Sequence, residues 1–332
     1  MTRELFAARS RTPAQLFAVL EYAVLAPSSH NTQPWRFRVT TDALELFADR
    51  ARALPAVDPC DRELVMSCGA ALFHARIALR RFGFRDDVEL FPDPAHQDFL
   101  ARVRPAEPYE PSDEERALFD AIPRRHTYRF AFESRPIPLQ LVAELQEAAS
   151  QEGAWLRILE GERVRGTVAS LIMQGDRIQM ADPEIRRELA AWTRPNSSRV
   201  TDGIPGNALG FGDLKAAAGP LVLRTFDLGR GQAARDRDLA LASPVLAVLG
   251  SFAESPYDWV STGQALARVL LRARIDGVCA SFLNQPIEVP TLRTQLEALT
   301  GARRFPQLLL RLGYGKDTAA TPRRPLEDVL ID

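Results

Sequence analysis

Residues 123–130, PRRHTYRF, concentrate side chains that can bind an anion. Arg125 and Arg129 carry fork-shaped guanidinium groups, and Thr127 between them carries a hydroxyl. Charged forks and a hydroxyl donor together suit a phosphate dianion. A cluster of arginines is often only a solvated turn, but this order of residues favours a phosphate site. His126 has two open interpretations, as a further phosphate donor or as a side chain packed in the turn.

A second polar segment, residues 26–37, reads APSSHNTQPWRF. Ser28 and Ser29 offer hydroxyls, Asn31 and Gln33 offer amides, and Trp35 begins an apolar run. Serine, asparagine and proline also form ordinary turns, so a plain connection between a helix and a strand is the alternative. The fixed order of so many polar groups is more specific than a turn and predicts a binding loop.

A third segment, residues 306–315, reads PQLLLRLGYG and predicts an apolar strand that ends in a Gly-Tyr-Gly turn. Residues 321–329, TPRRPLEDV, follow it and supply Arg323 and Arg324. Alone this tail carries no specific prediction. Its two arginines become informative beside the first two segments.

Composition excludes several classes of function. The chain has 332 residues with 42 basic and 43 acidic side chains, so its net charge of −1 disfavours general binding to nucleic acid or to an anionic membrane. Lys215 and Lys316 are its only lysines, and neither stands in a Walker-type phosphate loop. No apolar run reaches the length of a membrane span, and the start lacks a signal-peptide layout.

Cysteine and histidine spacing predicts neither a metal site nor a disulfide framework. The three cysteines, Cys60, Cys68 and Cys279, form no CxxC pair, and the four histidines lie far apart in the sequence. We interpret Cys279 and His74 as packed core side chains. A reducing compartment follows, and with no signal peptide we expect a cytoplasmic protein.

A weak internal duplication organises the chain. Five positions of one predicted helix recur 194 residues later in a second, namely Ser67, Gly69, Ala71, Leu72 and Gly83. Upstream, proline-started helices at residues 12–23 and 137–148 precede strand-like runs at residues 35–39 and 155–159. Each half therefore has the order helix, strand, long central helix.

Other segments are assigned from local composition. Residues 92–113 are rich in proline and acid and predict the linker between halves, with a short helix at residues 99–103. Later strands are predicted at residues 220–226, 244–249 and 307–312. Residues 192–213, rich in Gly, Pro, Asn and Ser, form a long irregular loop that predicts a lid or a disordered segment.

Together SSHNTQPW, DPCDRELVMSCGAAL, RRHTYR, FLNQPIEV and PQLLLRLGYG resemble the nitroreductase superfamily over essentially the whole chain, and specifically its duplicated, Acg-type branch. The resemblance implies an α+β fold, a nitroreductase-like three-layer α/β/α arrangement, with two fused repeats that form an intrachain pseudo-dimer. It implies FMN as the cofactor and NAD(P)H as a possible electron donor. The implied cofactor-binding residues are Pro27, Ser28, Ser29, Asn31, Gln33, Arg125, His126, Thr127, Arg129, Phe282, Asn284, Gln285, Arg323 and Arg324.

Under this resemblance the two halves divide the work. Residues 1–110 are a degenerate half that supplies the Ser/Asn loop. Residues 111–332 supply the phosphate site, the lid at 192–213 and the arginine tail, but read SQEGAW where the Ser/Asn loop would recur. We therefore expect one composite FMN site per chain and a monomer, with a weak dimer as the alternative.

The implied activity is NAD(P)H-dependent two-electron reduction of a nitro- or quinone-type acceptor through flavin N5, which requires no catalytic side chain. Small molecules are then the only expected partners. An alternative is a protein that stores or sequesters FMN without turnover, with Trp192 or Phe211 of the lid wedged onto the flavin. A third and weaker interpretation is a flavin-free interaction module.

One motif is interpreted as a coincidence. Residues 229–234, GRGQAA, fit the GxGxxA pattern of dinucleotide-binding folds. The charged flanks predict a surface loop instead, because this spacing is common by chance. Arg125→Ala is therefore expected to weaken FMN binding strongly, and Arg235→Ala is expected to leave it unchanged.

Overall fold

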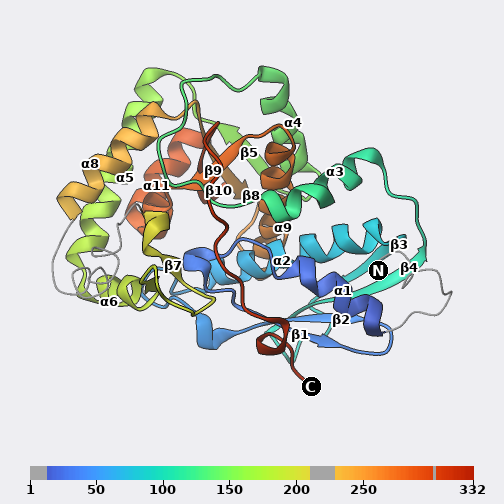
Figure 1. The fold of residues 1–332 in the computed structure, drawn as a ribbon. Helices are drawn as coiled ribbons and strands as arrows, with labels where there is room; N and C mark the ends of the chain where they lie inside the picture. Colours follow the sequence, from blue (N-terminus) through green and yellow to red (C-terminus); the bar gives the residue numbers. More distant parts are fainter. Residues whose placement is uncertain (1–12, 210–228, 302–303) are drawn as a thin grey trace.

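The computed structural model describes residues 13–209, 229–301 and 304–332, which form an α+β protein (Figure 1). Its first sheet has the antiparallel order β1-β2-β4-β3. The elements of this half are α1 (Pro13–Ala23), β1 (Trp35–Val39), β2 (Leu44–Ala48), α2 (Arg62–Arg81), β3 (Phe84–Leu90), β4 (Phe99–Pro108) and α3 (Asp113–Ala121).

The second sheet has the order β5-β8-β10-β9, which is the order of the first sheet when the four strands of each sheet are numbered along the chain. Its elements are α4 (Leu139–Ser150), β5 (Trp155–Ile158), α5 (Glu162–Ala181), α6 (Pro183–Ala191), β6 (Thr193–Arg194), β7 (Ile204–Pro205), α8 (Gly229–Ala242), β8 (Val245–Ser251), α9 (Pro256–Ile275), β9 (Cys279–Phe282), α10 (Gln285–Glu288), α11 (Pro290–Thr300) and β10 (Phe305–Gly313). Equal strand order supports the duplication, and the division at residue 110 stays a proposal.

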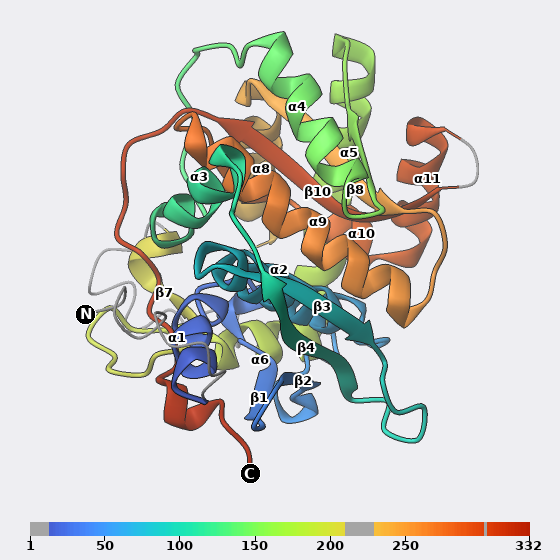
Figure 2. The same ribbon diagram turned by 90° about the vertical axis from the view of Figure 1, so that its right-hand side faces the viewer.

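Helices cover the two sheets differently. One face of the second sheet packs against α4 and α9, and the opposite face packs against α5, α8 and α11. This half therefore has the α/β/α layers (Figure 2). The first sheet packs one face on α1 and α2. Its outer face carries ion pairs such as Arg102 with Glu45, at 2.9 Å, and Arg102 with Glu89, at 3.2 Å.

The halves meet where α2 crosses α9, and two glycines make this contact possible. A Cβ on Gly69 would lie 2.3 Å from the carbonyl oxygen of Val260, and a Cβ on Gly263 would lie 2.0 Å from that of Met66. Each glycine therefore admits the backbone of the opposite helix. The contact is reciprocal, because both glycines and their two partners are related by the same 194-residue offset.

Residues after β10 return to the first half, as the red trace in Figure 1 shows. The Phe37 N–H donates to the carbonyl of Val329 at 2.7 Å, and the Ile331 N–H donates to the carbonyl of Phe37 at 2.9 Å. The tail thus adds backbone pairing to β1 at the edge of the first sheet. The C-terminal end of the second half is therefore attached to the first half.

The predicted helices at residues 12–23 and 137–148 and the two long central helices are confirmed, as are strands at 35–39, 155–159, 244–249 and 307–312. The short helix at 99–103 is wrong, because these residues form the start of β4, paired with β2 and β3. The predicted linker at 92–113 accordingly contains a ten-residue strand. The strand predicted at 220–226 lies outside the described residues. Among the helices that the structure describes, none is long and apolar enough to cross a membrane.

Candidate functional site

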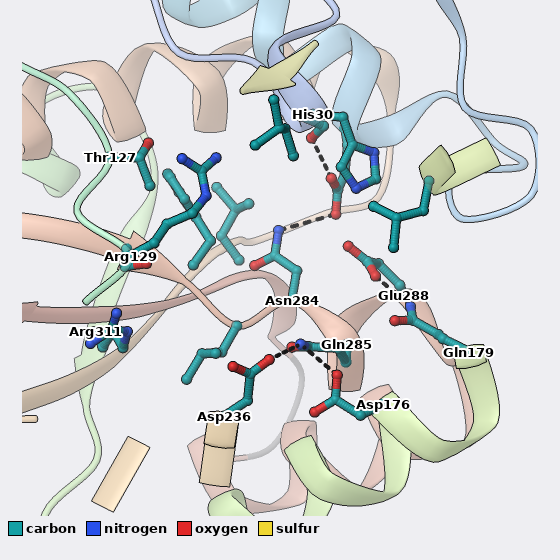
Figure 3. A pocket seen from close by; sticks show the side chains of 18 of the residues that line it. His30, Thr127, Arg129, Asp176, Gln179, Asp236, Asn284, Gln285, Glu288 and Arg311 are labelled. Carbon is teal, nitrogen blue, oxygen red and sulfur yellow. Dashed lines mark hydrogen bonds between the residues drawn. The ribbon is translucent and has the colours of Figure 1, made fainter. Parts of the chain in front are cut away.

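A cavity of about 810 Å³ lies between the two halves, and both halves supply its walls (Figure 3). Cavities of this size suit a cofactor or a small-molecule ligand. Eight of the residues predicted from the sequence line it, namely Pro27, Ser28, Ser29, Thr127, Arg129, Phe282, Asn284 and Gln285. Six others do not line it, namely Asn31, Gln33, Arg125, His126, Arg323 and Arg324.

The Ser/Asn loop is held in a strained conformation by its own amides. His30, Asn31 and Gln33 have φ values of 49°, 56° and 52°, in the left-handed region that non-glycine residues rarely adopt. The buried Asn31 amide donates to the carbonyls of Gly203 at 3.0 Å and Pro322 at 3.2 Å. These bonds turn the Asn31 side chain away from the cavity and present Ser28 and Ser29 to it.

Gln33 acts in the same way on the next turn of the loop. Its amide nitrogen donates to the Thr201 carbonyl at 2.9 Å, and its oxygen accepts from the Arg324 N–H at 2.8 Å. Because Gln33 is fully buried, these bonds satisfy groups that would otherwise be costly. Asn31 and Gln33 therefore join the loop to the segment before β7 and to the C-terminal tail.

Glu63, at the start of α2, connects cavity residues of both halves. It accepts a hydrogen bond from the Ser29 hydroxyl and another from the Asn284 amide at 3.2 Å. The Asn284 oxygen in turn accepts from the Leu309 N–H at 3.1 Å. The carboxylate thus fixes Ser29 of the first half relative to Asn284 of the second.

The basic segment is extended beside β9, which explains why only alternate side chains of this segment face the cavity. Thr127 bridges to Ala280, and the Tyr128 N–H donates to the Ala280 carbonyl at 2.9 Å. Thr127 and Arg129 then face the cavity, whereas Tyr128 is buried on the other side and stacks on Phe132 with centroids 5.5 Å apart. Burial lowers the pKa of Arg129 to about 10.

Arg125 and Arg323 lie together next to this wall without a counterion. Both donate to the Leu25 carbonyl, at 3.2 and 3.4 Å, and the Nε atom of each is buried with no hydrogen-bond partner in the described chain. Burial lowers the pKa of Arg125 to about 9, with a further contribution from Arg323, and burial lowers that of Arg323 to about 10. Two cations that share one carbonyl acceptor, each with a buried Nε atom and neither paired with a described carboxylate, favour an anion at this place.

His126 and Arg324 are placed differently. His126 is half-buried, its Nε2 atom has no partner in the described chain, and burial followed by Arg274 lowers its pKa. Arg324 donates to the Gln33 carbonyl at 3.1 Å and lies 3.8 Å from Asp49. Arg324 is thus engaged with the first half, and both interpretations of His126 remain open.

The sequence interpretation missed Arg311, which lines the cavity from β10. It is 1% exposed, donates to the carbonyls of Tyr128 at 3.3 Å and Phe130 at 2.9 Å, and has two nitrogens without a partner in the described chain. Burial lowers its pKa to about 10, an effect that Asp236 opposes. The available signal was a single arginine inside an otherwise apolar strand.

The predicted charged surface loop at residues 229–238 is wrong, because these residues form helix α8. Ala233, Asp236 and Ala240 are buried, and Arg235 and Asp236 line the cavity. Arg235 is therefore unsuitable as a control position for ligand binding, contrary to the expectation from sequence.

Two isolated residues behave as core side chains. The Cys279 thiol is buried, and burial raises its pKa. His74 is fully buried within α2, and burial lowers its pKa to about 3, so it is neutral at physiological pH. In the described part of the chain, no group of histidine, cysteine and carboxylate side chains is arranged to hold a metal ion.

An α+β fold of two similar halves with a cavity of this size between them is typical of proteins with a small-molecule site. Over 94% of its length the chain is 35% identical to a Mycobacterium tuberculosis protein whose name assigns it to the NAD(P)H nitroreductases, 90% of which is covered. The chain belongs to the nitroreductase family.

Other relatives carry similar names. The M. tuberculosis protein acg, also named as an NAD(P)H nitroreductase, is 29% identical, with 94% of each chain covered. The solved nitroreductase NfnB of Mycobacterium smegmatis in complex with NADPH has a TM-score of 0.43 and 17% identity, over 65% of this chain and 97% of that one. No protein-family profile matches the chain.

Proposed function

We propose that the cavity binds one FMN per chain and that the protein is an NAD(P)H-dependent oxidoreductase for nitro- or quinone-type acceptors. The observation that carries this proposal is the pair of cations Arg125 and Arg323, whose buried Nε atoms lack partners in the described chain. A phosphate dianion would supply the missing acceptor oxygens and charge. The names of the two M. tuberculosis relatives support the NAD(P)H part.

The other residues fit the remainder of the same cofactor. Arg129 supplies a cation inside the cavity, which suits the charge that a reduced flavin carries at its pyrimidine edge. Ser28 and Ser29 offer hydroxyls from the opposite half, held by Glu63 and by the strained loop. Phe282, Asn284 and Gln285 line a further part of the cavity.

In this mechanism FMN supplies hydride chemistry, and the chain binds and orients the reactants. Thr127, Arg125 and Arg323 would hold the phosphate, and Arg129 would stabilise negative charge. Glu63 fixes Ser29 of the first half relative to Asn284 of the second, so that the distance between these two parts of the cavity lining stays constant. Because one chain supplies all these groups, the proposal includes a monomer. It also includes a cytoplasmic location and no macromolecular partner.

FMN storage without turnover is the second candidate, and the attachment of the described lid residues favours it. Asp202 of the lid pairs with Arg52 and with Arg194, the latter at 2.7 Å. In helix α6, which precedes the lid, Glu188 accepts from the N–H groups of Ala56 and Val57. Trp192, one of the two proposed wedges, does not line the cavity, and this placement opposes that part of the storage candidate. Arg52 and Arg194 lie 5.2 and 5.6 Å from its ring centre. Phe211, the other proposed wedge, lies outside the described residues.

An anaerobic titration distinguishes the two candidates. The purified protein, restored with FMN, is titrated with NADPH and then with NADH while its visible absorption is recorded. Bleaching of the bound-flavin band supports the reductase. A bound flavin that dithionite bleaches and nicotinamides do not would support storage, and a chain that binds no flavin would overturn both.

A matched pair of variants tests the phosphate site. Arg125→Ala removes one of the two buried cations, and we expect FMN affinity to fall at least tenfold, because a charge-assisted bond contributes about 1.5–3 kcal/mol. Arg237→Ala on α8 is the control, since its partner Asp238 is exposed and the pair lies outside the cavity lining. Equal FMN affinity in parent, variant and control would reject the assignment.

A further inference from the structure

Two carboxyl groups from different helices meet at one wall of the cavity. Asp176 projects from α5 and Asp236 from α8, and both line the cavity. The Gln285 amide nitrogen donates to both, at 3.0 Å to Asp176 and 3.1 Å to Asp236 (Figure 3). Two carboxyl groups that share one amide nitrogen are close enough to repel each other when both are ionised.

The backbone is shaped to bring these groups together. A Cβ on Gly175 would lie 2.7 Å from the Cβ of Gln285, so only a glycine allows α5 to approach α10 this closely. The next residue is Asp176, which the approach places against the Gln285 amide. The close approach of α5 to α10 therefore holds the Asp176 side chain and the Gln285 amide in one arrangement.

One oxygen of the pair is left over. Asp176 is 2% exposed, and its Oδ2 atom is buried with no hydrogen-bond partner in the described chain. Burial, followed by repulsion from Asp236, raises the pKa of Asp176 to about 8. An unpartnered buried oxygen on a neutral carboxyl is a hydroxyl donor without an acceptor, and the Asp176 side chain that carries it belongs to the residues that line the cavity.

Asp236 is the better candidate for the charged member of the pair. It also accepts from the Gln232 amide at 2.8 Å, and the positive charges of Arg235 and Arg311 oppose the rise that burial causes in its pKa. Asp236 is thus the charged group that faces Asp176 from α8, and Arg311 faces Asp236 from β10. The proton shared by the two carboxyls is assigned to Asp176 on this ground.

We propose that Asp176 is the proton donor to the acceptor reduced in this cavity. The role rests on the proposed function. Reduction of a quinone to a hydroquinone consumes two electrons and two protons, here a hydride from the reduced flavin and one proton from Asp176. The O–H bond of Asp176 breaks, an O–H bond forms on a quinone oxygen, and water returns a proton to the carboxylate.

The first test needs no flavin. Infrared spectra of the apoprotein at pH 7 should contain absorption from protonated carboxyls, to which Glu288 also contributes because burial raises its pKa. Asp176→Asn should remove the Asp176 part of this absorption, and Asp238→Asn should retain it. Asp238 is a matched control because it lies on α8, is exposed and is absent from the cavity wall. A parent spectrum without a protonated carboxyl, or one that Asp176→Asn leaves unchanged, would overturn the proposal.

The second test measures reoxidation of dithionite-reduced, FMN-loaded protein by benzoquinone across pH. Dithionite separates this step from any failure of NAD(P)H to reduce the flavin. We expect Asp176→Asn to slow reoxidation by about 10²-fold or more, as for loss of a general acid. The parent rate should fall as the pH rises through about 8, where Asp176 loses its proton, and the variant should lack this decline.

Asp236→Asn distinguishes a proton donor from a residue that only supports the structure, because the pH dependence of reoxidation should change only if Asp176 donates the proton. Removing the facing negative charge lowers the pKa of Asp176, so the decline in rate should shift to lower pH. Unchanged reoxidation rates in Asp176→Asn, or a pH profile that Asp236→Asn does not shift, would reject Asp176 as the donor. A parent that binds no FMN would reject this proposal together with the proposed function.

Discussion

Gly263→Ala tests the contact between the two halves. The added Cβ would lie 2.0 Å from the backbone carbonyl oxygen of Met66, whereas real Cβ atoms essentially never come within 3.0 Å of such an atom. Helices α2 and α9 must therefore separate by about 1 Å at their crossing. Overpacking of this kind costs about 3 kcal/mol when the obstacle is backbone, and the higher helix propensity of alanine returns about 1 kcal/mol. We expect a net loss of about 2 kcal/mol in the free energy of unfolding.

Gly166→Ala is the matched control, because Gly166 also lies within a helix, α5, and a Cβ there would meet nothing within 4 Å. It should gain about 1 kcal/mol from helix propensity alone. Urea unfolding of both apoproteins, followed by far-UV circular dichroism, measures the difference of about 3 kcal/mol. If Gly263→Ala is as stable as Gly166→Ala, the reasoning from the helix crossing is refuted.

The same substitution should reach the cavity. Met66 and Ser67 on α2 and Leu266 on α9 line it, and all three lie within one turn of the crossing glycines. Separation of the helices would shift these side chains and the opposed walls. FMN affinity should therefore fall in Gly263→Ala and stay at the parent value in Gly166→Ala.

Three further outcomes follow from the anchoring of the loops around the cavity. Asn31→Ala leaves the carbonyls of Gly203 and Pro322 without their buried donor, so unfolding should become easier by about 1–3 kcal/mol and FMN should dissociate faster; an unchanged urea midpoint would contradict this. Asp202 has a pKa below the ordinary 3.8 because of its bonds to Arg194 and Arg52, so its contribution to stability is complete above pH 4 and is lost as the pH falls through its folded pKa. Asp202→Asn should therefore lower the melting temperature at pH 7, and this effect should shrink as the pH falls below the folded pKa of Asp202; an effect that does not change with pH would oppose the ion pair. In Glu63→Gln a donating amide nitrogen replaces one of the two carboxylate oxygens, so the side chain can no longer accept from both Ser29 and Asn284, and FMN affinity should fall. Glu162→Gln, exposed at the start of α5, should leave FMN affinity unchanged.

Sequence reasoning succeeded where one local pattern was decisive. Gly69 and Gly263 recur at the 194-residue offset, and their packing explains why a small residue is needed at both positions. The Ser28–Ser29 pair and the Thr127/Arg129 alternation also face the same cavity. Ser28 and Ser29 are adjacent, and Thr127 and Arg129 are two residues apart, so the order within each pair already indicates which side chains share a face.

It failed where a short segment takes its structure from distant partners. Residues 99–103, FLARV, are too short for periodicity to separate helix from strand, and pairing with β2 and β3 decides the outcome. In α8 the buried stripe of Ala233, Asp236 and Ala240 includes an aspartate, which hides the amphipathic pattern. Asp236 is buried because Gln285 and Gln232 satisfy it, and neither partnership can be read from sequence.

The returning tail has a consequence for the order of synthesis. Domains usually fold from the N-terminus as the chain emerges from the ribosome. Here β1 gains its edge partner from Val329 and Ile331, and the Ser/Asn loop gains bonds from Pro322 and Arg324. The first half is therefore translated more than 200 residues before the segment that completes it. A nascent chain holds an open sheet edge and an unformed cofactor loop until translation reaches that segment, so the cofactor can be captured only after the tail has been made.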